Sequence, residues 1–280
     1  MPPEPIDQAM TAGYAAVASF GQRQLWVVDH LLPDKTLYNE WWVDRLTGPL
    51  DVAALERALS DIVRRHDMLR TRFAVINGVL SQVVAPPSPQ ALPVEDLAGL
   101  PLHEREAQAR RRAEALHARP FDLQRGPLFG ARLLRLAPQE HWLLLMMHHI
   151  IFDRWSAAVL ARELSELYRA FSLGLPSPLP ELPVQYADYA EWQQEWLAGE
   201  RLDRLLAYWK SALAELPTLD LPTDRRRLPV ASFQGGQIEF EIGDELAAAR
   251  RTSPRAPSTS SGGPCFAPDS SGSGRRSIGC

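Results

Sequence analysis

The sequence predicts an α/β fold, because helical and strand patterns alternate between residue 19 and about residue 245. The run Trp142–Met147 is apolar throughout, which is typical of a strand covered on both faces of its sheet. An amphipathic helix follows it, with apolar residues at helical spacing: Leu160, Leu164, Leu167, Tyr168 and Phe171. Hydrophobic residues make up 45% of the chain, which is enough for a substantial core.

The first predicted element is a helix over residues 52–66. Asp51 can cap it, and its apolar residues again follow helical spacing: Val52, Leu55, Leu59, Ile62 and Val63. Two strands are predicted next, over Leu69–Val75 and Val79–Val84. The dipeptide Asn77-Gly78 between them is a strong signal for a hairpin turn.

The proline-rich stretch Pro86–Pro93 then leads to a charged surface helix over His103–His117. Pro120 stops this helix, because proline lacks the amide hydrogen that the helix needs. A strand over Leu128–Leu136 precedes the apolar strand described above, and Ser156 is expected to begin and cap the amphipathic helix.

The segment Gly174–Pro183 holds four prolines and is the best internal domain boundary. Two helices beyond it carry aromatic residues that are expected to pack in a core or between lobes: Tyr186, Tyr189, Trp192, Trp196 and Trp209. Gln237–Ile242 is predicted to be a final strand. In residues 251–280, 21 of 30 residues are Ser, Gly, Pro or Arg, so we expect disorder. The chain has 28 arginines to 2 lysines, which indicates a GC-rich gene. A GC-rich gene read in a shifted frame gives a tail of this composition, so we expect a frameshift or truncation rather than a natural linker.

Composition argues against several classes of protein. A net charge of −4 is not that of a nucleic-acid surface, and the short arginine runs Arg110–Arg112 and Arg225–Arg227 are expected to be solvated. No apolar run is long enough to span a membrane, and no secretory signal is visible. Both cysteines, Cys265 and Cys280, lie in the last sixteen residues, so a reducing, cytoplasmic location is expected.

The segment His148–Asp153 is the best candidate for chemistry. Adjacent strand residues point to opposite faces, so one histidine should face a cavity and the other the core. That geometry argues against a metal site, which needs converging ligands. A neutral imidazole suits amine attack on an acyl ester, because it can accept the proton. Asp153 is costly to bury alone and should find an arginine or backbone partner.

Five ordered motifs resemble those of the condensation domains of nonribosomal peptide synthetases. The run His148–Ser156 is similar to the family signature His-His-x-x-x-Asp-Gly and the Trp-Ser that follows it. Four further segments resemble the family's other motifs: Ser19–Trp26, Arg65–Phe73, Tyr186–Gln193 and Leu221–Arg225. Two departures stand out, since Arg154 replaces the family's glycine and Asp67 replaces the commoner glutamate.

The resemblance implies a chloramphenicol-acetyltransferase-like fold of two lobes. Residues 1–18 would be an extension, residues 19–175 a complete first lobe, residues 176–249 a linker and the start of a truncated second lobe, and residues 250–280 the tail. The implied reaction joins a donor acyl or peptidyl thioester to the amine of an aminoacyl acceptor. Both substrates would arrive on phosphopantetheine arms of carrier proteins, beside an adenylation domain, with no bound cofactor or metal.

The resemblance also assigns roles to residues. It makes His149 the catalytic residue and places His148 in a structural position. Asp153 would form a structural ion pair with Arg65 or Arg70, and the residues alone do not choose between them. The residues implied at the substrate channel are Arg154, Trp155 and Ser156.

Two alternatives remain open at this point. The first is a coenzyme-A-dependent acyltransferase of the same superfamily, and the second is a non-catalytic fragment that binds carrier proteins. A fragment without most of its second lobe is not expected to be active by itself. If Met1 is the natural start, only 18 residues precede the Ser19 motif, so the donor is expected to arrive in trans. A starter subtype that attaches a lipid is one form of such delivery.

Overall fold

The computed structural model describes residues 13–217 of the chain. The predicted strand Gln237–Ile242, the Leu221–Arg225 motif, the cysteines and the predicted tail lie outside the described residues. Within residues 13–217, no helix is both long enough and apolar enough to cross a membrane.

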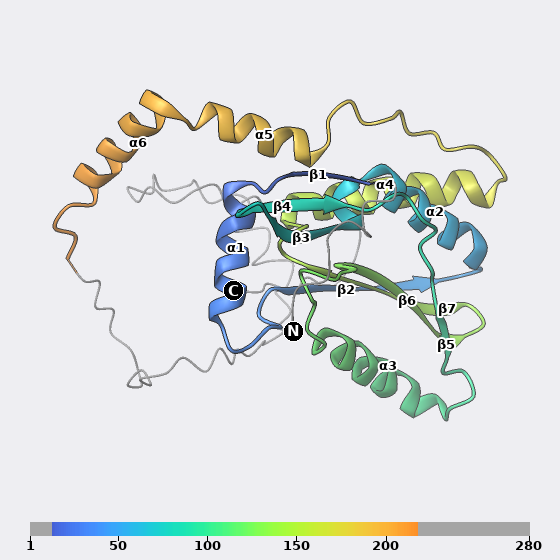
Figure 1. Ribbon diagram of the computed structural model, residues 1–280. Coiled ribbons are helices and arrows are strands. Elements are labelled where there is room, and N and C mark those ends of the chain that lie inside the picture. Colours follow the sequence, from blue (N-terminus) through green and yellow to red (C-terminus); the bar gives the residue numbers. More distant parts are fainter. Residues whose placement is uncertain (1–12, 218–280) are drawn as a thin grey trace, which may run out of the picture. The chain divides into compact units, whose positions relative to one another are not determined.

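A four-stranded sheet forms the centre of the described part of the chain (Figure 1). Its strands, in spatial order, are β2 (Asn39–Thr47), β7 (Glu140–His148), β6 (Phe129–Ala137) and β5 (Val94–Asp96). Neighbouring strands are antiparallel except β5 and β6, which are parallel. Helix α3 (Leu102–His117) covers one face, and helices α2 (Val52–Arg65) and α4 (Arg154–Ser172) cover the other.

Strand β7 is buried on both faces, as its continuous apolar run predicts. Leu143 and Leu145 belong to the cluster that α2 and α4 cover, whereas Trp142 and Leu144 belong to the cluster under α3. The three leucines are each at most 2% exposed. Full burial of one such side chain contributes roughly 1.5–3 kcal/mol. The α/β fold class and this strand are therefore confirmed.

A second, antiparallel sheet has the order β1 (Tyr14–Val17), β4 (Val79–Val84) and β3 (Thr71–Ile76). Asn77 and Gly78 between β3 and β4 have φ values of 51° and 81°. Two positive values are what the tight hairpin requires, so the predicted turn is confirmed. Strand β3 begins two residues later than predicted, because residues 67–70 form a short 3-10 turn.

Among the strands and α-helices of the described residues, four were not predicted: β1, α1 (Phe20–Leu31), β2 and β5. Strand β1 lies within residues 1–18, which the sequence assigned to an extension, yet it pairs with β4. Helix α1 begins with a capping box, in which the Ser19 hydroxyl accepts from the Gln22 amide and the Gln22 side chain accepts from the Ser19 amide.

The aromatic helices differ from the prediction. Helices α5 (Tyr186–Trp196) and α6 (Gly199–Ala212) follow the proline-rich segment, but their large rings are not buried among the described residues. Successive α5 rings contact one another with centroids 5.3–5.9 Å apart, and the Trp192–Trp196 pair is stacked. Polar contacts hold α5 instead, because Gln193 accepts from the Phe20 amide and Gln194 donates to the Ala18 carbonyl.

Candidate functional site

His148 is the last residue of strand β7 and His149 follows it, and the two rings lie in different surroundings. His148 is 1% exposed, and its Nδ1 accepts a hydrogen bond from the Ile150 amide at 3.0 Å. Nδ1 therefore carries no hydrogen, and the ring is neutral. Burial, and to a smaller extent the neighbouring His149, lower the pKa of His148 to about 4. The prediction that this ring lies in the core is confirmed.

His149 lies in the turn that follows β7, and its side chain is 37% exposed. Its amide donates to the Tyr38 carbonyl at 2.8 Å, which ties the turn to the start of β2. The Tyr38 ring lies nearly parallel to the imidazole, with centroids 6.2 Å apart. Nδ1 is buried and lies 3.1 Å from Oε1 of Glu40, but not at the angle of a hydrogen bond. The exposed surface of the side chain therefore lies on the other atoms of the imidazole.

Asp153 is the N-cap of α4, a role that the sequence assigned to Ser156. Its carboxylate accepts from the Ser156 amide at 2.8 Å and from the Ser156 hydroxyl at 2.7 Å. Burial raises the pKa of Asp153, but the hydrogen bonds from Ser156, the Trp155 amide and the nearby His149 together more than offset this, so the pKa lies below its ordinary value. The carboxylate thus fixes the turn between the histidines and α4.

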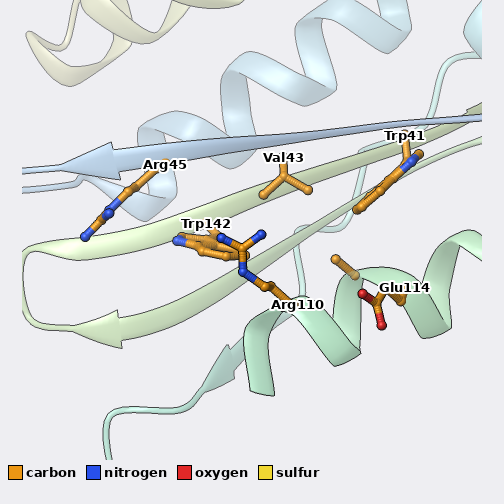
Figure 2. Close-up of a pocket in the computed structure, with 7 residues that line it drawn as sticks. Trp41, Val43, Arg45, Arg110, Glu114 and Trp142 are labelled. Atoms are coloured by element: carbon orange, nitrogen blue, oxygen red, sulfur yellow. The ribbon is translucent and has the colours of Figure 1, made fainter. Parts of the chain in front are cut away.

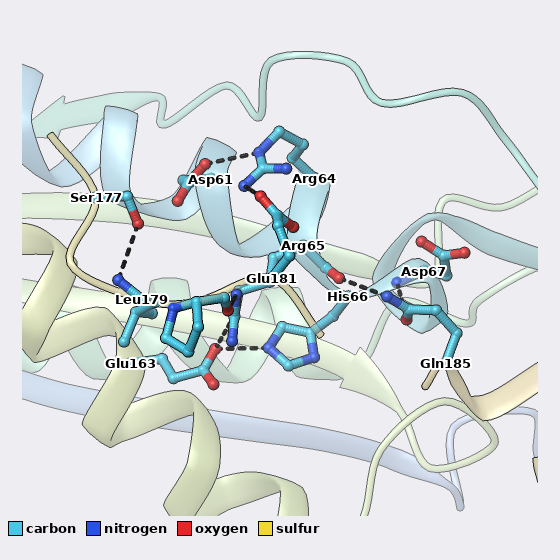
Figure 3. Close-up of polar contacts among 11 residues, drawn as sticks. Asp61, Arg64, Arg65, His66, Asp67, Glu163, Ser177, Leu179, Glu181 and Gln185 are labelled. Atoms are coloured by element: carbon cyan, nitrogen blue, oxygen red, sulfur yellow. Dashed lines mark hydrogen bonds and ion pairs between the residues drawn. The ribbon is translucent and has the colours of Figure 1, made fainter. Parts of the chain in front are cut away.

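The predicted ion pair between Asp153 and an arginine is wrong for both candidates. Arg65 donates from Nε to Glu163 of α4 at 3.1 Å, and both side chains are almost fully buried (Figure 3). Arg70 pairs with Asp67, three residues before it. Asp153 instead needs no cation, because it is partly exposed and its hydrogen bonds to Ser156 satisfy it.

Around Arg65, polar contacts connect α2, α4 and the proline-rich segment (Figure 3). His66 Nε2 lies 2.7 Å from the same Glu163 oxygen. Arg65 also donates to the Pro180 carbonyl, and Gln185 donates to the Arg65 carbonyl at 3.0 Å. The segment before α5 is thus held against α2 and α4. The division into lobes after residue 175 stays a prediction.

The residues expected at the channel lie in the first turn of α4. Arg154 and Trp155 are exposed, Trp155 to 76%, while Ser156 takes part in the cap. Their contact with a substrate stays a prediction. In the part of the chain that the structure describes, no group of three or more His, Cys, Asp or Glu side chains could hold a metal ion.

A cavity of about 280 Å³ lies between α3 and the sheet (Figure 2). Trp41 and Arg45 of β2 line it together with Trp142 of β7, and Arg110 of α3 lies over the Trp142 ring. His149 is not among its lining residues, so this cavity does not mark the predicted reaction site.

The structure adds residues that the sequence reasoning missed. Tyr38 directly precedes β2 and Glu40 is its second residue, and both contact His149, although this strand was not predicted. The run Trp41-Trp42-Val43 was the available signal, because aromatic and β-branched residues favour strands. Glu163 had no such signal, since its partner Arg65 lies 98 residues away.

Comparison with known proteins identifies the family. The family model of the condensation domain matches residues 14–260. The chain belongs to the condensation-domain family. A linear gramicidin synthase protein from Brevibacillus parabrevis is 46% identical to this condensation domain over 229 residues, which cover 81% of the chain but 4% of the relative. Chondramide synthase from Chondromyces crocatus is 42% identical over 86% of the chain and 6% of its own length.

Solved structures agree on the fold of this condensation domain. The first condensation domain of the CDA synthetase matches with a TM-score of 0.63 and 27% identity, over 73% of this chain and 52% of that one. The starter condensation domain of rhizomide synthetase matches with a TM-score of 0.66 and 24% identity, over 73% and 49%. The predicted chloramphenicol-acetyltransferase-like fold is therefore confirmed. The chain spans about half the length of these solved domains.

Proposed function

We propose that this condensation domain contributes the histidine-bearing lobe of an amide-forming site in a nonribosomal peptide synthetase. The proposal is carried by the position of His149, where Nδ1 is buried beside Glu40 and the side chain is still 37% exposed. The exposed surface therefore lies on the part of the ring away from Nδ1, where a substrate amine can approach. The family membership and the large multidomain relatives support the same reading.

In the proposed reaction the amine of a carrier-bound aminoacyl group attacks the carbonyl carbon of a donor thioester. The new carbon–nitrogen bond forms as the carbon–sulfur bond breaks. His149 Nε2 accepts the proton that the amine loses and passes it to the departing thiolate, which leaves as the phosphopantetheine thiol of the donor carrier. A positioned proton-transfer group of this kind typically contributes about 10²–10⁴-fold to the rate.

The remaining roles follow from the same proposal. Carrier proteins would present both substrates on phosphopantetheine arms, and an adenylation domain would load the acceptor. Arg154 and Trp155 follow His149 closely in the sequence, and both are exposed. They would lie at the entrance of the channel that takes one phosphopantetheine arm. Asp153 would act only through the turn that it caps.

The test uses a hybrid domain, in which the 229 residues of this chain that align with the gramicidin synthase relative replace the matched residues of that relative. Mass spectrometry would measure the amide formed from a donor thioester and an aminoacyl carrier protein. His149→Ala is expected to lower amide formation by about 10²-fold or more. The matched control is His103→Ala, because His103 is 82% exposed on α3. Unchanged amide formation in the His149 variant would refute the proposal.

Starter activity is a second candidate, in which the donor is an acyl coenzyme A instead of a carrier-bound acyl group. A variant of the rhizomide synthetase starter domain has been solved in complex with C8-CoA, and it matches this chain with a TM-score of 0.65 and 25% identity. The hybrid domain would be offered acyl coenzyme A and acyl carrier protein as competing donors. Preference for acyl coenzyme A would support the starter subtype, and strict use of the carrier would exclude it.

A further inference from the structure

The start of strand β2 contacts His149 through both backbone and side chain. Tyr38 accepts the His149 amide hydrogen bond, and two residues later Glu40 places Oε1 3.1 Å from Nδ1 of the imidazole. Glu40 pairs with Met147 in the β2–β7 register, so the sheet itself sets where the Glu40 backbone lies relative to the histidine turn. The sheet therefore fixes the backbone of Glu40, and the hydrogen bond to Tyr38 ties the histidine turn to the residues before β2.

The chemistry of this contact determines which ring nitrogen carries the hydrogen. An ionised carboxylate can only accept hydrogen bonds, so it attracts Nδ1 only when Nδ1 is protonated. Nδ1 is buried and has no hydrogen-bond partner among the described residues. A buried donor without a partner costs about 1–3 kcal/mol, so the nearby Glu40 is the acceptor that favours the Nδ1–H form. The neutral ring then has its lone pair on Nε2, on the side of the imidazole away from the buried Nδ1.

We infer that Glu40 is a positioning residue, which holds His149 in the Nδ1–H tautomer and presents the Nε2 lone pair to the substrate amine. This inference rests on the role proposed above for His149. Hydrogen bonds at catalytic groups are often poorly aligned before substrate binds, so the present angle fits a contact that tightens on binding. The side chains of Glu40 and His149 are 44% and 37% exposed, and exposed ion pairs contribute little to stability. The role of Glu40 is therefore one of orientation.

The test is nuclear magnetic resonance of the full 280-residue chain with ¹⁵N-labelled histidine, at a pH where the imidazole is neutral. Long-range ¹H–¹⁵N correlations report which ring nitrogen carries the hydrogen, and the His149→Gln variant assigns the signals. The chain as it stands is expected to show the Nδ1–H tautomer at His149. Glu40→Leu is expected to move the population toward Nε2–H, and Glu40→Asp to restore part of the Nδ1–H form.

The matched control is Glu104→Leu, because Glu104 lies 3.6 Å from His103 on the exposed face of α3. It should leave the His149 signals unchanged. An Nε2–H tautomer in the unaltered chain, or the same tautomer in Glu40→Leu, would overturn the inference.

Kinetics of the hybrid domain separate this inference from the proposed function. Glu40→Leu is expected to lower kcat by about 10-fold or more with KM unchanged, as part of the contribution of a positioned base. If the tautomer depends on Glu40 but His149→Ala forms amide normally, the proposed function fails and the contact stands. If amide formation requires His149 but the His149 tautomer is the same in Glu40→Leu, the proposed function stands and this inference fails.

Discussion

Replacing Glu163 with glutamine tests whether the buried network at Arg65 stabilises the fold. The side chains of Arg65 and Glu163 are 4% and 6% exposed, so their charges compensate one another away from water. Glu163→Gln keeps the size of the side chain but leaves the arginine charge unpaired. Removing one partner of a buried ion pair typically costs about 3–5 kcal/mol. For a domain of this size that corresponds to a fall in Tm of about 6–20 °C.

Urea denaturation followed by tryptophan fluorescence, and thermal melts followed by circular dichroism, would measure the change in the free energy of unfolding. The matched control is Glu166→Gln on the same helix, since Glu166 and Arg169 form an exposed pair. That pair should contribute less than about 1 kcal/mol. A loss in Glu163→Gln as small as in the control would show that the arginine is solvated, and the argument from burial would be refuted.

Two further predictions concern the histidine turn. The pKa of His148 is about 4 in the folded chain against 6.5 for the free side chain, so the unfolded chain binds the proton more tightly and acidification from about pH 6.5 to pH 4 destabilises the fold. Between pH 7 and pH 5 the free energy of unfolding should fall by about 2 kcal/mol through His148. Urea titrations at the two pH values should show that this loss disappears in His148→Gln and persists in the control His103→Gln. Asp153→Ala should cost only about 0.5–2 kcal/mol, the loss of an N-cap, and Asp153→Ser should recover most of it. A loss above about 3 kcal/mol would instead indicate a buried ion pair at Asp153.

Local patterns in the sequence were sufficient to predict several helices and strands of the fold. The Asp51 cap and the apolar spacing predicted α2, and Asn77-Gly78 predicted the hairpin between β3 and β4. The unbroken apolar run predicted the burial of β7 on both faces. These predictions succeed because capping, turn geometry and amphipathic spacing depend on residues within a few positions of one another. Strand alternation predicted different surroundings for His148 and His149, but His149 lies in the turn after β7, where its amide donates to the Tyr38 carbonyl.

Contacts between distant segments were decided only by the tertiary structure. Arg65 could not be matched to a partner from sequence, and it pairs with Glu163 because α2 and α4 pack on the same face of the sheet. Glu40 reaches His149 only because β2 lies beside β7, although the two strands are far apart in the chain. The aromatic rings of α5 look like core residues, yet they are exposed among the described residues. Pairing and burial of this kind depend on which elements pack together. The residues near each position in the sequence do not determine that packing.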